Sequence, residues 1–386
     1  MVSGAEWGFR CGVGRSPGSR HRSTGFAGGR CRPQTPVRGV AVPVARPRVV
    51  GMAVPEHLLR QLSQLHWQGV FSAAEAGRVG VSGPVLARWV ARGIVLRVIH
   101  GWYVLAGEAG ARPDRHDCVL AAVLAAYDGA VVASHHSALR MHGLPVFGCP
   151  DEVHVTHRRR PSIRIGRGYV VHAADAVTAS SAAPEPGATG AVAAVPVAAA
   201  LVQCGLRFGP VPLLVAGDAA LLERRVAPPE IDAMVHSYAH APGMAAVRRA
   251  VPLLDPRSES VGESLLRYAL HLLGWAVESQ YRPPGVARRC DMLLLGTRLV
   301  VEFDGMAKFT TGRAVDTVGA TQAAVRSAVT SVFDRDEELA GRGLHVLHVT
   351  WRQLLDADGT LRLADLRRRV RTRLAAIREQ ESQGAG

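Results

Sequence analysis

The stretch Gln68-Gly69-Val70-Phe71-Ser72-Ala73-Ala74-Glu75 decides the fold of the first patterned part of this chain. Ser72 followed three residues later by Glu75 forms a capping box, in which each side chain accepts a hydrogen bond from the other residue's backbone N–H. A helix is therefore predicted to begin directly after Ser72 and to end near Gly80.

Further elements extend outward from this helix start. Residues 56–66 are predicted to form a preceding helix, and Ser82 with Pro84 begins another helix that runs to Arg92. Residues 94–105 alternate as two strands that turn near His100-Gly101.

Helix, turn, helix and hairpin is the element order of a winged helix, which reads DNA with its second helix and its hairpin. In that case the candidate DNA contacts are Arg88, Arg92 and Arg97. The alternative interpretation is a small structural helical pair with a solvated basic rim.

Residues 67–106 resemble the winged-helix module of the AbiEi-type antitoxins of abortive-infection systems. Ser134 to Leu144 resembles the SH-x-S/T-A-x-x-x-H-G-L element that follows this module in the family. The resemblance implies DNA binding, autoregulation and a cognate toxin as partner, and nothing catalytic in residues 52–256.

The middle of the chain carries helix and strand patterns without a catalytic cluster. Helices are expected over 115–126 and within 197–254, and strands over 151–157 and 163–172, with 173–196 as a linker. The histidines of the 134–144 helix do not fall at a convincing metal-ligand spacing with a carboxylate, so packing or surface roles are predicted for His135, His136 and His142.

The pattern changes from residue 257. An amphipathic helix is predicted over 260–273 with Glu263 in its first turn, followed by strands over 287–295 and 298–304. Side chains alternate along a strand, so Glu302 and Asp304 share one face, and Asp291 lies on the adjoining strand. Carboxylates gathered in this way repel one another unless a cation joins them, and oxygen ligands suit Mg²⁺ or Mn²⁺.

This arrangement resembles the PD-(D/E)xK nuclease superfamily, and within it the very-short-patch-repair endonuclease group, over about residues 257–377. The resemblance rests on residues 260–263, 289–291, 301–305 with Lys308, and 344–351. It implies an αβββαβ core in which Asp291, Glu302 and Asp304 hold Mg²⁺, Glu263 is an outer ligand and Lys308 orients water or stabilises the phosphate.

Two departures from the superfamily pattern bear on activity. The catalytic lysine normally follows the glutamate by two residues, but Asp304 occupies that position and Lys308, the only lysine of the chain, lies four residues further on. The Glu-Lys pair usual in this group is also missing from residues 332–337. A non-enzymatic regulator that keeps a degenerate nuclease fold is therefore the alternative.

The closing helix, expected over 361–378, carries an apolar stripe beside several arginines. These arginines are Arg367, Arg368, Arg369, Arg371 and Arg373. They form either a solvated face or an edge that contacts phosphates.

Composition limits the class of protein. The net charge of +14 favours a polyanionic partner, although nine arginines fall in residues 1–51, which lack an apolar period and are interpreted as a disordered tail or a misassigned start. The six cysteines form no C-x-x-C pair, which fits a reducing cytoplasm, and no window is long and apolar enough to span a membrane.

The sequence thus predicts an α+β multidomain protein: a winged helix, a small α/β and helical middle region, and a C-terminal α/β core similar to restriction endonucleases. The expected divisions are 1–51, 52–110, 111–180, 181–256 and 257–380. The predicted function is DNA binding with Mg²⁺-dependent phosphodiester hydrolysis in defence or repair.

Overall fold

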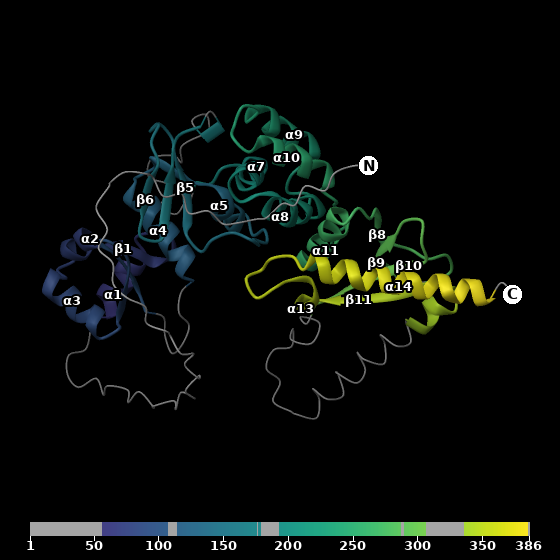
Figure 1. Cartoon of the computed structure of the whole chain (residues 1–386). Helices are drawn as coiled ribbons and strands as arrows, with labels where there is room; N and C mark the ends of the chain where they lie inside the picture. The colour runs from purple at the N-terminus through teal and green to yellow at the C-terminus, as the bar shows by residue number, and fades with distance from the viewer. Residues whose placement is uncertain are drawn as a thin grey trace, which may run out of the picture. The chain divides into compact units, whose positions relative to one another are not determined.

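The computed structural model describes residues 56–106, 114–175, 177–178, 193–286, 289–305 and 336–384. All of them fall in one unit, Val54–Gly386. The described residues form a mixed α and β structure with three sheets (Figure 1). The predicted tail, residues 1–51, lies outside the described residues.

The first part contains helices packed on a small sheet in the order β1-β3-β2. Its elements are α1 (Glu56–Ser63), the short 3-10 helix η1 (Trp67–Gly69), β1 (Val70–Ser72), α2 (Ala73–Arg78), α3 (Gly83–Ala91), β2 (Val95–Ile99) and β3 (Trp102–Leu105). The predicted hairpin is present as β2 and β3, and β1 adds a strand that the sequence analysis did not predict.

The predicted capping box at Ser72 is confirmed. Glu75 N–H donates to Ser72 Oγ at 3.1 Å, and Ser72 N–H donates to Glu75 Oε2 at 2.7 Å. Ser82 occupies the N-cap position of α3, but its side chain makes no capping hydrogen bond. The helices are held by a core that includes Phe71, Leu86 and Trp89, which are all buried.

The second part has a four-stranded sheet in the order β4-β5-β7-β6. Its elements are α4 (Arg115–Ala126), β4 (Val131–Ala133), α5 (His135–Met141), β5 (Val153–His157), β6 (Arg164–Gly166) and β7 (Tyr169–His172). The single strand predicted over 163–172 is wrong: the chain turns at Gly168, φ 84°, and forms the hairpin β6–β7. Because β7 pairs in parallel with β5, the residues of two distant segments share one sheet face.

Helices follow in the next segment, and they are α7 (Val197–Phe208), α8 (Pro210–Leu222), α9 (Pro228–Ser237), α10 (Met244–Ala250) and the 3-10 helix η3 (Val251–Leu253). Glycine at 205 lets α7 approach α8 closely, because a Cβ there would lie 2.6 Å from Leu213 Cδ1.

The C-terminal part begins with α11 (Val261–Leu272), capped by Ser260, whose Oγ accepts a hydrogen bond from Glu263 N–H. It continues with β8 (Val277–Tyr281), β9 (Cys290–Leu294), β10 (Leu299–Asp304), β11 (His345–Thr350), α13 (Trp351–Leu354) and α14 (Leu363–Gly384). The sheet order is β11-β10-β9-β8, with β8, β9 and β10 antiparallel in turn and β10 parallel to β11.

A buried ion pair ties α8 to α11. Asp218 is fully buried, and its Oδ2 lies 2.6 Å from Arg267 Nη2. Asp218 Oδ1 also accepts a hydrogen bond from Asp255 N–H at 2.8 Å. The predicted division between 181–256 and 257–380 is thus crossed by a desolvated charge pair, in addition to the apolar packing of Val215.

Among the helices of the described segments, none is long and apolar enough to cross a membrane.

Candidate nucleic-acid interface and acidic cluster

The helix α3 presents a basic face on the side opposite its core contacts. Leu86 and Trp89 are buried, whereas Arg88 is exposed and Arg92, the C-cap residue directly after the helix, is exposed as well. Positions four residues apart lie on the same side of a helix, so these two guanidinium groups can reach one anionic surface together.

The third predicted DNA contact, Arg97, is exposed on β2. Its Nη2 lies 2.7 Å from Nδ1 of His100, which follows the strand. The hairpin therefore offers a cation whose side chain is held in place by a neighbouring ring.

Two of the predicted acidic residues meet across β9 and β10. Asp291 N–H donates to Glu302 Oε1 at 3.2 Å, and Phe303 N–H donates to Asp291 Oδ2 at 2.7 Å. The strand register places Asp291 opposite Glu302, because Met292 pairs with Val301. Glu302 is 4% exposed, so its carboxylate lies in an environment that penalises charge.

Glu263, which was predicted to be an outer ligand, has hydrogen bonds that hold the start of α11. Its carboxylate accepts hydrogen bonds from Glu259 N–H, Ser260 Oγ and Gln280 Nε2, at 2.8 to 3.0 Å. Burial raises the pKa of Glu263, and the negative charge of Asp291 adds to this shift. The carboxylates of Glu263 and Asp291 therefore interact electrostatically, although both oxygens of Glu263 already accept hydrogen bonds.

Asp304, at the end of β10, lies beside a histidine of β11. His348 Nδ1 is 3.1 Å from Asp304 Oδ2, and His348 Nε2 is 3.0 Å from Asp336 Oδ2. These two carboxylates raise the pKa of His348 to about 9, so the ring is a cation at neutral pH. The sequence predicts an added cation that relieves the repulsion among the acids, and His348 supplies positive charge beside Asp304 from the protein itself.

The role of His348 was missed because it depends on strand pairing. The parallel register of β10 and β11 places His348 opposite Glu302, which no local spacing shows. Lys308 lies outside the described residues. Residues 332–335, most of the stretch that was compared with the Glu-Lys pair, also lie outside them.

The structure does not gather the predicted magnesium ligands into one cluster of three. Within the described part of the chain, the groups with three donor atoms within 4.8 Å are His135, His154 and His172, and Asp114, His116 and Asp117. The assignment of Asp291, Glu302 and Asp304 as ligands thus stays a prediction.

The arginines of the closing helix divide into two sets. Arg369 and Arg373 donate to the backbone carbonyls of His348 and Val346, at 2.9 and 3.1 Å, and hold α14 against β11. Arg368 pairs with Asp365 on its own helix. These arginines are therefore engaged in the fold.

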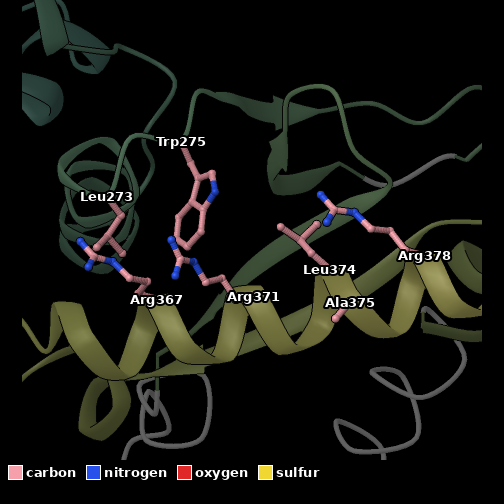
Figure 2. A pocket seen from close by; sticks show the side chains of 7 residues that line it. All are labelled: Leu273, Trp275, Arg367, Arg371, Leu374, Ala375 and Arg378. Carbon is pink, nitrogen blue, oxygen red and sulfur yellow. The ribbon is translucent and has the colours of Figure 1, made fainter. Parts of the chain in front are cut away.

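The second set lines a groove of about 380 Å³ between α14 and the turn after α11 (Figure 2). Arg367 points from α14 toward the side chain of Leu273, Arg371 points toward the indole of Trp275, and Arg378 lies further along the helix. All three arginines are exposed. An aromatic ring beside exposed guanidinium groups suits a nucleic acid strand, which offers phosphates and stacking bases.

Comparison with known proteins bears on the first part of the chain. Residues 57–106 match the family model described as "Transcriptional regulator, AbiEi antitoxin". No curated protein matches the chain. Among solved structures, the crystal structure of the RV2827C protein from Mycobacterium tuberculosis is similar at 16% identity with a TM-score of 0.35, over 51% of this chain and 74% of that chain.

The match covers α1, α2, α3 and the β2–β3 hairpin, the elements on which the exposed Arg88, Arg92 and Arg97 are displayed. Residues 57–106 are therefore an AbiEi-type DNA-binding domain of the antitoxin and transcriptional-regulator kind.

Proposed function

We propose that this protein is a DNA-binding transcriptional regulator that acts as the antitoxin of a toxin–antitoxin pair. The observation that carries the proposal is the AbiEi-type domain at residues 57–106 together with the exposed Arg88 and Arg92 on the outer side of α3. In winged-helix proteins this second helix enters the major groove, and arginines contact phosphates and base edges.

The hairpin would support binding from the adjacent backbone. Arg97 is exposed on β2, and its contact with His100 reduces the number of side-chain conformations that binding must restrict. The groove at Arg367 and Arg371 is a further candidate contact, from the C-terminal part of the chain.

Removing the α3 arginines should weaken DNA binding and its salt dependence together. The full chain is titrated with duplex DNA from upstream of its own gene at several salt concentrations. If both side chains contact phosphates, Arg88→Ala with Arg92→Ala lowers the slope of log K against log salt by about 2, since each lost contact removes about 0.9.

The control is Arg224→Ala with Arg225→Ala, which removes the same charge from the turn after α8 and should leave the slope unchanged. Arg367→Ala with Arg371→Ala tests the groove in the same assay. Equal affinity and slope in the wild type and the Arg88, Arg92 variant would contradict the proposed DNA interface.

A second candidate function is phosphodiester hydrolysis in the C-terminal part. The favouring observation is that Asp291 N–H donates to Glu302 Oε1 while Asp291 Oδ2 accepts from Phe303 N–H, so the two carboxylates lie on adjoining strands of a sheet against which α11 and α14 pack. Oxygen donors suit Mg²⁺ or Mn²⁺, which Asp291, Glu302 and Asp304 would hold and which would stabilise charge on the reacting phosphate. Each carboxylate also has a protein partner, which the ion would have to replace or share.

If this second function holds, Mg²⁺ or Mn²⁺ stabilises the protein and supports nicking of a plasmid. An ion at a hundred times its dissociation constant should add about 2.7 kcal/mol to the free energy of unfolding. Glu302→Gln should abolish the added stability and the nicking together, whereas Glu278→Gln, an exposed acid on β8, should keep both.

Lys308→Arg separates the roles, because a planar guanidinium replaces a mobile ammonium. Metal-dependent stabilisation should persist while nicking falls. Nicking that is equal with and without the Glu302 carboxylate would show that the site is assigned wrongly. Metal binding without cleavage of any DNA tested would leave the regulator as the function.

A further inference from the structure

Five histidines gather in the second part of the chain, on α4, α5, β5 and β7. Ring centroids lie 4.1 Å apart for His135 and His172, 4.8 Å for His154 and His172, and 4.8 Å for His136 and His154. The ring of His116 lies 5.7 Å from that of His136. Such a concentration is unusual for a protein interior, where apolar side chains normally provide the packing.

Three of these rings direct nitrogens toward one place. One donor nitrogen from each of His135, His154 and His172 lies within 4.8 Å of the other two. His135 is 7% exposed and His154 is 2% exposed, while His172 is partly buried. The parallel pairing of β5 and β7 sets Thr156 opposite His172, so His154 and His172 point from the same sheet face, two positions apart.

Packing alone does not account for the geometry at His135. Its φ is 52°, a left-handed conformation that side chains with a Cβ rarely adopt and that costs energy unless the surroundings enforce it. The surroundings do so here: His135 N–H donates to Gln203 Oε1 at 3.1 Å, and His135 Nδ1 lies 2.9 Å from Ser134 Oγ. The second contact fixes the ring and leaves Nε2 as its remaining nitrogen.

The nitrogens of the other two rings are already adjacent. His172 Nε2 lies 2.9 Å from His154 Nδ1, so one of these nitrogens donates a hydrogen bond to the other. Next to them, His136 donates from Nε2 to the carbonyl of Glu152 at 2.8 Å, and its buried Nδ1 has no hydrogen-bond partner among the described residues. A buried nitrogen at the edge of the cluster thus has no hydrogen-bond partner among the described residues, which is costly.

These rings are neutral at neutral pH. Burial lowers the pKa of His154 to about 2 and the pKa of His136 and His172 to about 4, and it lowers the pKa of His135 strongly as well. A neutral imidazole keeps a free lone pair, which is the form that binds metal ions.

We propose that His135, His154 and His172 form a binding site for a divalent transition metal of the zinc class. Imidazole nitrogens suit Zn²⁺, and three protein ligands leave one coordination position for water or another ligand. The ion would lie between His154 Nδ1 and His172 Nε2, and the proton that these nitrogens share would move to the other nitrogen of its ring, so that both ligands stay neutral; a modest closure of the rings would bring His135 to the ion. The site is independent of the DNA-binding surface and of the acidic cluster.

One nearby charge opposes the ion and provides a direct test. The guanidinium of Arg207 on α7 is close enough to lower the pKa of His135, His154 and His172, so it also repels a dication. Arg207 is exposed, which makes its replacement tolerable for the fold. Arg207→Gln should therefore bind the metal more tightly than the wild type.

The test uses the full chain, freed of metal by a chelator and titrated with Co²⁺ followed by visible absorption, then with Zn²⁺ in competition. We expect one equivalent of Co²⁺ with the spectrum of a four-coordinate site. His154→Phe and His172→Phe should each weaken binding by at least about 100-fold, more than the loss of an outer-shell partner. His142→Phe, whose ring instead bonds the carbonyl of Val195, should bind as the wild type does.

Two further variants distinguish this site from a neighbouring one and from a failure to fold. His116→Phe removes the ring from the group of Asp114, His116 and Asp117; loss of binding in this variant but not in His154→Phe would place the metal there and overturn the proposal. If the histidine variants fail to fold, comparing metal binding by the wild type and by Arg207→Gln still tests the proposed site. Tighter Co²⁺ binding and a higher melting temperature with Zn²⁺ in Arg207→Gln support the site, and absence of Co²⁺ binding to both proteins overturns it.

Discussion

Replacing Asp218 by asparagine should lower the free energy of unfolding by about 3–5 kcal/mol, because it leaves the guanidinium of Arg267 buried without its counter-charge. Asp218 is fully buried and Arg267 is 8% exposed, so water cannot take over the lost interaction. Asparagine keeps the size of the side chain and an acceptor for Asp255 N–H, but it removes the charge and replaces the oxygen that accepts from Arg267 with an NH2 donor. Urea unfolding of the full chain measures the effect.

The matched control is the ion pair of Arg225 and Glu223, which has the same N–O distance of 2.6 Å but side chains that are 48% and 43% exposed. Glu223→Gln should cost no more than about 1 kcal/mol. The comparison separates the burial of a charge pair from its geometry.

Replacing both partners should restore most of the stability. Burial raises the pKa of Asp218 although Arg267 lies beside it, so desolvation opposes the charged form of this carboxyl. Asp218→Leu with Arg267→Met removes both charges and should unfold near the wild type or above it. A double variant as unstable as Asp218→Asn would show that packing around this pair, and not its charge, stabilises the contact of α8 with α11.

Gly262→Ala should be the second most damaging change, at about 3 kcal/mol, the upper end of the usual range for overpacked cores. A Cβ at Gly262 in α11 would lie 1.9 Å from Cε1 of the Phe303 ring. Phe303 is 6% exposed and its ring packs edge-on against Trp351, with centroids 4.8 Å apart, so it has little room to move. Denaturant unfolding and the melting temperature measure the loss.

The same substitution elsewhere serves as the control. Gly77 lies within α2, and a Cβ added there would meet no atom within 4 Å, so Gly77→Ala should leave stability unchanged or raise it by up to about 1 kcal/mol. Phe303→Leu should recover part of the stability of Gly262→Ala, because it removes the atoms that the new methyl group meets. Gly262→Ala unfolding at the wild-type denaturant concentration would refute the close packing of α11 on β10.

This contact also connects stability with the candidate acidic site. Phe303 lies between Glu302 and Asp304 on β10, so a displaced ring would shift both carboxylates. Gly262→Ala should thus weaken any divalent-cation effect on stability along with the fold.

The elements that the sequence predicted well depend on residues close together in the chain. The capping box of Ser72 and Glu75 and the amphipathic helix after Ser260 follow from contacts over three or four residues. The hairpin that brings Asp291 opposite Glu302 also needs only a short turn between its strands. Local backbone chemistry is enough to specify these features.

Strand pairings between distant segments decided what the sequence missed. Neither the break between β6 and β7 nor the parallel pairing of β7 with β5 follows from alternation along 163–172. That pairing brings His154 and His172 to His135, and the pairing of β11 with β10 brings His348 to the side of Asp304.

The sequence by itself thus determined the AbiEi-type domain, its exposed arginines and the pair of acids at Asp291 and Glu302. Only the tertiary structure decided which ionisable groups share an environment: the histidine cluster, His348 with two carboxylates, and Arg267 with Asp218. The physical reason is that burial and electrostatic interaction depend on distance in space, and residues tens of positions apart become neighbours only when strands pair and helices pack.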